Sequence, residues 1–280
     1  MRVQRCFGFV DLCGFTAFTE RFGDELAVVA LARFRTTLRE IAARRGVRIT
    51  KWLGDGAMLS SADTEATVAM VLEVSANADA MLAPALRRAD ATQGNGNNNN
   101  NNSSSSSSNP ELWAADPWEA DAWTGGSRPV NEPPAGDDHL ALRAGLASGP
   151  VIMFEGDDYI GRPTNMASRL CDAAMPGQVL ATREVAAAAP RWAAASEALT
   201  YYVRGFDKPL EAVRLKPGTS DTMVTDPVCK LSLPLVSGLV TRRMSNLVKD
   251  DGAMEYFCST ACALAWEQAQ RGATGAPFPI

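Results

Sequence analysis

The sequence has little histidine, no long hydrophobic run and no excess of positive charge, and each shortage excludes a class of function. One histidine, His139, occurs in 280 residues, which excludes most mechanisms that depend on histidine. Lys and Arg number 27 against 32 Asp and Glu, a formal net charge of -5, so neither nucleic acid nor a membrane is expected as a partner. No window reaches the roughly 18 apolar residues of a spanning helix, and no signal-peptide pattern opens the chain. We therefore expect a cytoplasmic protein.

The six cysteines occur in two different settings. Three are scattered among apolar residues, which is typical of buried thiols: Cys6, Cys13 and Cys171. The other three fall in the last fifth of the chain: Cys229, Cys258 and Cys262. In a cytosolic protein such a cluster indicates metal or redox chemistry rather than a disulfide framework. Cys258 and Cys262 are four apart at a predicted helix start, so both sulfur atoms could face one ion, with Cys229 as a third ligand.

Strand and helix patterns alternate along the chain. The first half predicts a strand in "RCFGFVDLCGFT", a helix over 24–46, a hairpin over 47–61 that turns at Gly54-Asp55-Gly56, and a helix over about 64–86. The second half predicts a strand pair turning near Gly149-Pro150, a helix in "RPTNMASRL", a strand over 178–182, an alanine-rich helix over about 182–198 and a closing strand pair. Mixed helices and hairpins indicate an α+β domain.

The composition changes divide the chain into parts. We expect a first domain over 1–216, interrupted by a low-complexity insertion over about 87–138 that contains "QGNGNNNNNNSSSSSSNP". A linker over 217–223 leads to a small unit over 224–270, and 271–280 forms a tail.

Two aspartates occupy positions where strands end or turn. Asp11 ends the first predicted strand, and Asp55 lies in the hairpin turn. Two carboxylates that converge could hold the Mg²⁺ ions that nucleotide phosphates require, although aspartates at such places also serve simply as turn formers. A G-x-x-x-x-G-K-[ST] loop is absent, which excludes a P-loop nucleotide enzyme.

Asn165 and Arg169 are four apart on one predicted helix and therefore share a face. Their amide and guanidinium groups could meet a phosphoryl group that gains charge. An ordinary exposed polar face is the alternative interpretation.

Three motifs in this order strongly resemble the class III adenylate/guanylate cyclase catalytic domain: "FVDLCGFTAFTE", "KWLGDGAML" and "DDYIGRPTNMASRL". "VRGFDKPLEAVRL" resembles its closing strands. The resemblance covers about residues 5–215 apart from the insertion. It implies a ferredoxin-like α+β fold, with a mixed, mainly antiparallel sheet and helices.

The resemblance also implies a role for each of six residues. They are two metal-binding aspartates for two Mg²⁺ or Mn²⁺ ions (Asp11, Asp55), an adenine-type purine-reading pair (Lys51, Asp158), a ribose-positioning residue (Asn165) and a residue that stabilises the pentavalent phosphorus (Arg169). The implied reaction converts ATP to cyclic AMP and pyrophosphate. The implied enzyme is a homodimer with sites at the interface, so Lys51 and Asp55 of one chain would serve different ATP molecules.

The small unit resembles the YHS/TRASH-type metal-associated module in "VTDPVCKLSLPL" and "MEYFCSTACALAWEQ". This implies a soft or borderline ion such as Zn²⁺ or Cu⁺ at Cys229, Cys258 and Cys262, with cyclase output regulated by metal or thiol state. Arg243-Met244-Ser245 stands where Tyr-His-Ser is expected, and no fourth ligand is evident. The alternative functions are an inactive cyclase-like nucleotide-binding scaffold attached to a metal-binding module, or a metal-handling protein.

Overall fold

The computed structural model describes residues 1–83, 140–154, 158–243 and 254–274. The insertion expected over about 87–138, together with His139 and residues 275–280, lies outside this part. The main sheet contains β1 (Arg2–Cys13), β2 (Arg48–Leu53), β3 (Gly56–Ser61), β4 (Ala141–Phe154), β5 (Asp158–Ile160), β6 (Val179–Thr182), β7 (Ala193–Ala195), β8 (Leu199–Tyr201) and β9 (Leu210–Pro217). Its strand order is β2-β3-β1-β4-β6-β9-β7, with β5 on β4 and β8 on β9. The β4–β6 pair is parallel and the other pairs are antiparallel, which confirms the expected α+β class.

Strand β1 lies inside the sheet, between β3 and β4, and is covered on both faces. Successive side chains of a strand point to opposite faces. Cys6, Val10 and Leu12 accordingly join the larger core cluster, whereas Phe7 joins a second cluster with Met58. Both neighbours of β1 pair with it antiparallel, and Phe7 lies between Ser60 of β3 and Ala147 of β4. This pairing fixes which residues of β3 and β4 lie opposite each residue of β1, including Asp11.

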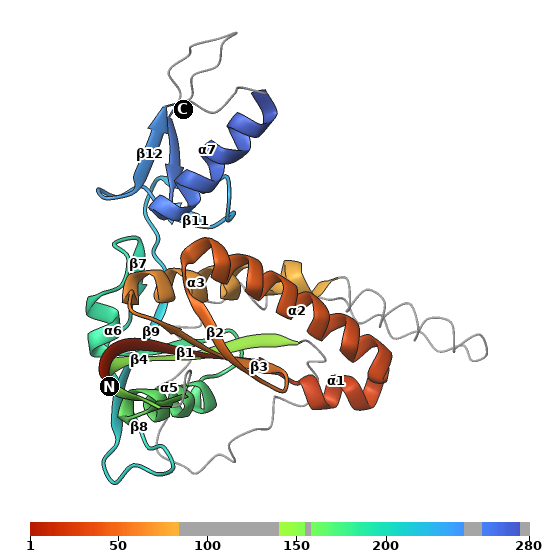
Figure 1. The fold of residues 1–280 in the computed structure, drawn as a ribbon, viewed down its shortest axis with the longest axis vertical. Helices are drawn as coiled ribbons and strands as arrows, with labels where there is room; N and C mark the ends of the chain where they lie inside the picture. Colours follow the sequence, from red (N-terminus) through yellow and green to blue (C-terminus); the bar gives the residue numbers. More distant parts are fainter. Residues whose placement is uncertain (84–139, 155–157, 244–253, 275–280) are drawn as a thin grey trace, which may run out of the picture.

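Helices pack on both faces of the sheet (Figure 1). They are α1 (Phe15–Phe22), α2 (Asp24–Arg45), α3 (Thr64–Ala76), α5 (Arg162–Ala173) and α6 (Arg183–Ala187). Helices α2 and α3 lie over one face and α5 lies over the other. Gly46, with φ 65°, ends α2 in the left-handed conformation that glycine adopts readily, as the sequence predicted. None of the helices in the described ranges is both long and apolar enough to cross a membrane.

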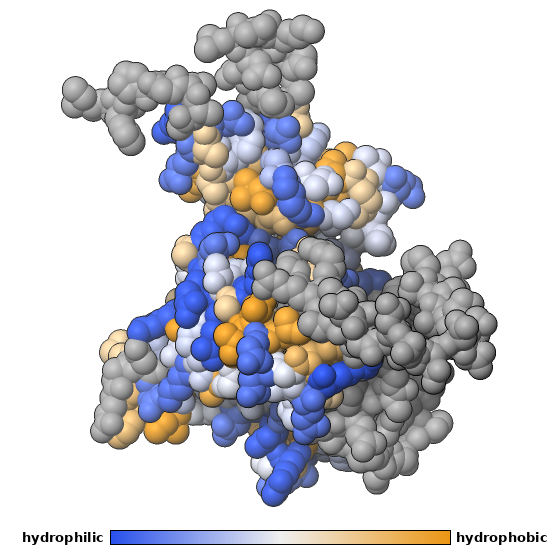
Figure 2. Space-filling view, turned by 90° about the vertical axis from the view of Figure 1, so that its right-hand side faces the viewer, coloured by the Kyte–Doolittle hydropathy of each residue, from blue (hydrophilic) through white to orange (hydrophobic). Residues whose placement is uncertain are grey.

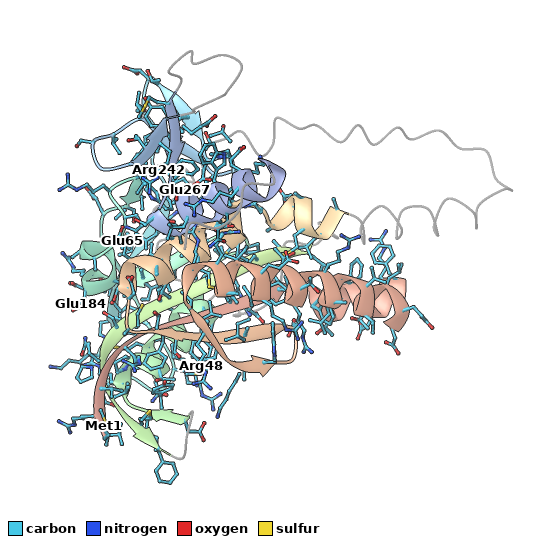
Figure 3. The ribbon with its side chains drawn as sticks, turned by 45° about the horizontal axis from the view of Figure 1, so that its top comes forward. Met1, Arg48, Glu65, Glu184, Arg242 and Glu267 are labelled. Carbon is cyan, nitrogen blue, oxygen red and sulfur yellow. The ribbon has the colours of Figure 1, made fainter. Side chains whose placement is uncertain are left out.

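The C-terminal unit consists of β10 (Met223–Thr225), β11 (Ser232–Pro234), β12 (Val240–Arg243), β13 (Met254–Phe257) and α7 (Thr260–Thr274). An ion pair between Arg242 of β12 and Glu267 of α7 joins two of its elements (Figure 3). The unit sits over the helix layer of α2 and α3, and Figure 2 shows it joined to the larger part through a narrower waist. Its buried Phe257 and Leu233 belong to the same core cluster as the larger part, so the two parts share apolar contacts.

Two of the predicted elements are wrong. No turn occurs at Gly149-Pro150, because both residues continue the pairing of β4 with β1 and the strand runs on to Phe154. The expected alanine-rich helix is short: α6 ends at Ala187, shortly before Pro190, which cannot supply a helical N–H. The alanines at 193–195 then form β7 against β9. Pairing with the sheet therefore prevails over the helix propensity of alanine.

Candidate functional site

Asp11 lies near the end of β1, directly opposite Arg143 of β4. Arg143 Nε and Nη2 both donate to Asp11 Oδ2, at 2.9 and 2.7 Å. Arg143 Nη1 also donates to the main-chain oxygen of Asp172 at 3.4 Å. The arginine therefore orients the Asp11 carboxylate and connects it to the end of α5. Sequence reasoning missed Arg143, because only the strand register reveals that it faces Asp11 across 132 positions.

Asp55 occupies the turn between β2 and β3, and this turn presses against Asp11. A Cβ atom built on the neighbouring Gly56 would lie 2.8 Å from the Val10 main-chain oxygen and 3.0 Å from Asp11 Oδ1. Burial, followed by the negative charge of Asp11, raises the pKa of the Asp55 carboxyl. The structure thus brings the two predicted aspartates together, with Asp11 Oδ1 on the side of the turn and Oδ2 held by Arg143.

Two carboxylates at one point suit a hard cation. Mg²⁺ and Mn²⁺ prefer oxygen ligands, and Mg²⁺ usually takes one or two carboxylates together with substrate phosphates. Burial raises the pKa of Asp55, and the negative charge of Asp11 raises it further; a divalent cation between the two carboxylates would favour their ionised forms. The residues present therefore fit the expected metal.

Lys51 of β2 and Asp158 of β5 form an ion pair. Strand β5 lies back along β4, and Tyr159 packs against Phe7 of β1 with ring centroids 5.2 Å apart. This packing carries Asp158 to the level of the β2–β3 hairpin. The Lys51 and Asp158 side chains remain 49% and 48% exposed, so a planar ligand edge could reach both groups.

Helix α5 presents Asn165 and Arg169 to one pocket of about 200 Å³. The pocket is also lined by Ser168 and by three residues of the loop before β9: Arg204, Gly205 and Phe206. Arg169 Nη1 donates to Asp172 Oδ2 at 2.7 Å, and both side chains are nearly half exposed. The expected shared helix face is therefore observed, whereas Arg204 was missed because nothing in its local sequence distinguishes it.

The seating of α5 depends on Gly145. A Cβ atom at this position of β4 would lie 2.2 Å from both the Ala167 oxygen and the Cys171 nitrogen. The helix backbone therefore touches the strand backbone directly. This contact sets the depth at which α5 holds its pocket residues over the sheet.

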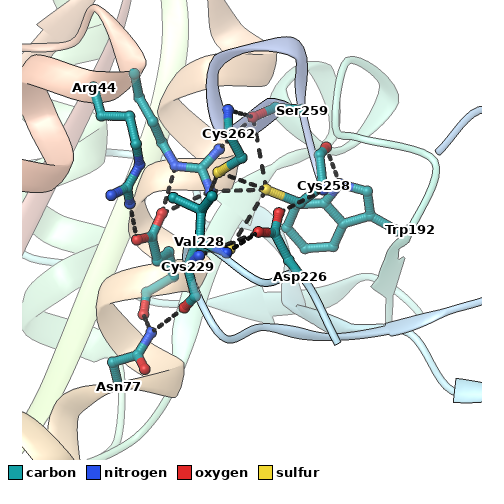
Figure 4. A network of polar contacts seen from close by, with 11 residues as sticks. Arg44, Asn77, Trp192, Asp226, Val228, Cys229, Cys258, Ser259 and Cys262 are labelled. Carbon is teal, nitrogen blue, oxygen red and sulfur yellow. Dashed lines mark hydrogen bonds and ion pairs between the residues drawn. The ribbon is translucent and has the colours of Figure 1, made fainter. Parts of the chain in front are cut away.

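The last three cysteines meet in one buried cluster (Figure 4). Cys229 Sγ and Cys262 Sγ each lie 3.6 Å from Cys258 Sγ. Ligand atoms of these three residues and of Asp226 all lie within 4.8 Å of one another. Three sulfur atoms in this geometry could bind one soft or borderline cation, as their spacing predicted.

Asp226 is fully buried and holds the cluster together. Its Oδ1 accepts from the main-chain N–H groups of Val228 and Cys229 at 2.8 and 3.2 Å, and its Oδ2 accepts from that of Cys258 at 2.8 Å. Its carboxylate thus ties the turn before Lys230 to the start of α7. It could complete a four-ligand set, but three hydrogen bonds already give it an organising role.

The scattered cysteines behave differently from the cluster. Burial raises the pKa of Cys6 and of Cys13 to about 11, which keeps these thiols protonated. In the cluster, hydrogen bonds with Cys229 and Cys258 lower the pKa of Cys262, while hydrogen bonds with Cys258 and Cys262 raise that of Cys229. These hydrogen bonds favour the thiolate form of Cys262 within the cluster.

Comparisons with known proteins agree with this fold. No family model matches the chain. An uncharacterized protein of Mycobacterium tuberculosis is 27% identical over 209 residues, 74% of this chain and 40% of that protein, so the chain spans about two fifths of its length. An adenylate cyclase of Streptomyces coelicolor is 39% identical over 67 residues, 23% of this chain and 18% of that enzyme.

Two solved structures share the fold. One is an adenylate cyclase from Trypanosoma brucei, with 21% identity, a TM-score of 0.53 and coverage of 83% of this chain and 93% of that one. The other is the guanylyl cyclase Cya2, with 17% identity, a TM-score of 0.51 and coverage of 79% and 96%. The chain therefore has the fold of nucleotide cyclase catalytic domains. Because adenylyl and guanylyl cyclases share this fold, the fold does not select the base.

Proposed function

We propose that the chain is a nucleotide cyclase, and specifically an adenylate cyclase that converts ATP to 3′,5′-cyclic AMP and pyrophosphate. The observation that carries the proposal is the convergence of Asp11 and Asp55 across Gly56, on the fold that nucleotide cyclases share. The partial match to an adenylate cyclase of Streptomyces coelicolor supports the same activity.

In this reaction the 3′-hydroxyl oxygen forms a bond to the α-phosphorus. The bond from that phosphorus to the oxygen bridging to the β-phosphate breaks, pyrophosphate leaves with the bonding electrons, and the hydroxyl proton passes to water. Two Mg²⁺ or Mn²⁺ ions held by Asp11 and Asp55 would supply the positive charge that lowers the pKa of the hydroxyl and stabilises the leaving group.

The residues of α5 act on the phosphate and the ribose. The exposed ion pair between Arg169 and Asp172 contributes only about 0–1 kcal/mol. When substrate binds, Arg169 leaves this pair and forms charge-assisted hydrogen bonds to the α-phosphoryl oxygens. These bonds strengthen as charge develops on the phosphorus. Asn165, in the same pocket, orients the ribose so that its 3′-oxygen faces the phosphorus.

The ion pair of Lys51 and Asp158 favours adenine. The Lys51 ammonium can donate to adenine N1, and the Asp158 carboxylate can accept from the N6 amine. Both groups keep nearly half of their side-chain surface exposed, which leaves room for the purine edge without breaking the pair.

The proposed active form is a homodimer with each site built from two chains. The pocket lined by Asn165 and Arg169 includes neither Asp11 nor Asp55, which supports a site that a second chain completes. Mixing an Asp11→Asn chain with an Arg169→Ala chain tests this: each variant alone should be inactive, and the mixture should regain part of the activity. A mixture as inactive as its components would contradict the shared site.

The activity test uses the full chain with ATP or GTP and Mn²⁺, followed by quantification of cyclic nucleotide and pyrophosphate. We expect cyclic AMP, and we expect Asp11→Asn and Asp55→Asn to abolish its formation, while Asp24→Asn, an exposed carboxylate on α2, leaves it unchanged. Cyclic GMP alone would overturn the adenine assignment. No product from either nucleotide, with Mn²⁺-ATP still bound, would favour the alternative of a nucleotide-binding scaffold.

The proposal extends to the C-terminal unit, which we separate from the cyclase domain at residues 217–223. Its three cysteines, with Asp226 as a candidate fourth ligand, would bind a soft or borderline cation such as Zn²⁺ or Cu⁺. Cyclase output would then respond to occupancy of this site. The Cys229→Ser, Cys258→Ser double variant should lose any effect of the metal on cyclic AMP formation, and an unchanged metal response would exclude this regulation.

A further inference from the structure

Arg45, the last residue of α2, reaches from the cyclase fold to the cysteine cluster. Its Nη2 lies 3.0 Å from Cys258 Sγ and 4.0 Å from Cys262 Sγ. Its Nη1 donates to Ser259 Oγ at 3.3 Å, and its Nε donates to Glu73 Oε2 of α3 at 2.7 Å. With 1% of its side chain exposed, this guanidinium is buried between the helices and the cysteines.

The charges around Arg45 do not balance within the cyclase fold. Glu73 forms ion pairs with both Arg44 and Arg45, so two cations share one buried carboxylate. The Arg44 side chain is 20% exposed and thus accessible to water, whereas that of Arg45 is 1% exposed. A buried charge without a counter-charge is strongly unfavourable. The sulfur atoms of Cys258 and Cys262 lie next to the Arg45 guanidinium, and as thiolates they would supply the further negative charge.

The two parts of the chain are joined at the same place by neutral hydrogen bonds. Trp192 Nε1 donates to the Cys258 main-chain oxygen at 2.8 Å, and Asn77 Nδ2 donates to the Cys229 main-chain oxygen at 3.2 Å. Two of the three cysteines are therefore positioned by residues of the larger part. The cluster is assembled by both parts together.

We propose that Arg45 is a positioning residue of the cysteine site, which is a shared site of the two parts and takes a divalent, borderline-soft cation. This rests on the metal site of the proposed function. Three thiolates, the Asp226 carboxylate and one divalent cation carry a net charge of -2, which the Arg45 guanidinium reduces to -1 at the sulfur atoms. A monovalent cation in the same set would leave a net charge of -2 with Arg45 counted, so the divalent cation is the better match. Occupancy of the site is thereby coupled to the α2–α3 helix pair through Arg45 and Glu73.

The first test titrates Zn²⁺ against a chromophoric chelator in wild type, Arg45→Met, Arg45→Lys and Arg44→Met. Loss of an outer-shell partner weakens metal binding by about 10–100-fold, and we expect this range for Arg45→Met. Arg45→Lys keeps the positive charge but loses the several N–H donors of the guanidinium. Its Zn²⁺ affinity should lie between those of Arg45→Met and wild type. Arg44→Met is the comparison variant: Arg44 contacts the other oxygen of Glu73 and no sulfur atom, so its loss leaves Glu73 to Arg45 alone and should weaken Zn²⁺ binding less than Arg45→Met does.

The second test needs no substitution and therefore does not depend on the variants folding. Hydrogen exchange of the wild-type chain is followed with and without one equivalent of Zn²⁺, and slower exchange is expected in the last turn of α2 and in α3. Equal Zn²⁺ affinity of Arg45→Met and wild type, or unchanged exchange in both helices when Zn²⁺ is bound, would overturn the proposal. Failure of folded wild type to bind Zn²⁺ would also overturn it. None of these readouts requires cyclic nucleotide formation, so a failure here is distinguishable from an absent cyclase activity.

Discussion

Replacement of Gly56 by alanine would place a methyl group against the Asp11 carboxylate of the proposed metal site. The added Cβ would lie 2.8 Å from the Val10 oxygen and 3.0 Å from Asp11 Oδ1, whereas ordinary contacts begin at 3.4 Å. The β2–β3 turn must therefore move by about 0.6 Å, the difference between 3.4 and 2.8 Å, because the Val10 oxygen is main chain and cannot rotate away. Such overpacking costs roughly 1–3 kcal/mol of folding free energy.

The functional effect should exceed the effect on folding. A misplacement of about 1 Å at a catalytic group can cost on the order of 10²-fold in rate, so a shift of this size should cost roughly tenfold or more. We expect Gly56→Ala to remain folded, to bind Mn²⁺ more weakly and to form cyclic AMP at least about tenfold more slowly than wild type.

The assay compares cyclic AMP formation over a Mn²⁺ series with thermal unfolding of the same preparations. Gly54→Asn in the same turn is the matched control: Gly54 has φ 66° and no atom within 4 Å of a built Cβ, and asparagine tolerates this backbone conformation. It should keep the wild-type Mn²⁺ dependence. Wild-type Mn²⁺ affinity and rate in Gly56→Ala would refute the inference that the turn and Asp11 form one site.

Three further predictions concern charge, base recognition and the join between the two parts. Burial and a neighbouring carboxylate raise the pKa of Asp55 in the folded chain. Ionisation of Asp55 therefore destabilises the fold. The loss of stability is complete at pH values above the raised pKa and disappears at pH values below the ordinary pKa of 3.8. Asp55→Asn should therefore raise the metal-free melting temperature at neutral pH but not below 3.8, and a lower melting temperature at neutral pH would contradict this. Lys51→Ala and Asp158→Ala should raise KM for ATP and reduce the preference for ATP over GTP. The free energy of unfolding in urea should change by less than about 1 kcal/mol, because the pair is exposed. An unchanged preference for ATP would contradict a role of these residues in recognising the base. Trp192→Phe leaves the buried main-chain oxygen of Cys258 without its donor. The free energy of unfolding in urea should fall by about 1–3 kcal/mol. An unchanged free energy would show that water replaces the indole N–H.

Local patterns predicted most elements of the larger part because their signals lie within a few residues. The helix over 24–46 matches α2 nearly to the residue, and the Asp-Gly hairpin matches β2 and β3. The helix expected over about 64–86 is interrupted, since α3 ends at Ala76. The remaining errors came where a distant strand decides the outcome, at Gly149-Pro150 and in the alanine-rich stretch.

The candidate site shows the same division. The i, i+4 spacing alone predicted the shared face of Asn165 and Arg169, and the hairpin signal alone placed Asp55 in a turn. Asp11 and Asp55 approach each other only because β3 pairs with β1, a contact that Gly56 permits. Lys51 meets Asp158 only because β5 folds back along β4.

The sequence by itself determined which residues we assign to the proposed chemistry: paired aspartates, an amide and a guanidinium on one helix, and three clustered thiols. Only the tertiary structure decided their partners. Arg143 holds Asp11 across 132 positions, and Arg45 reaches Cys258 across 213. No local propensity encodes such distances, because burial of a charge is decided by the packing of elements that meet only in the folded chain.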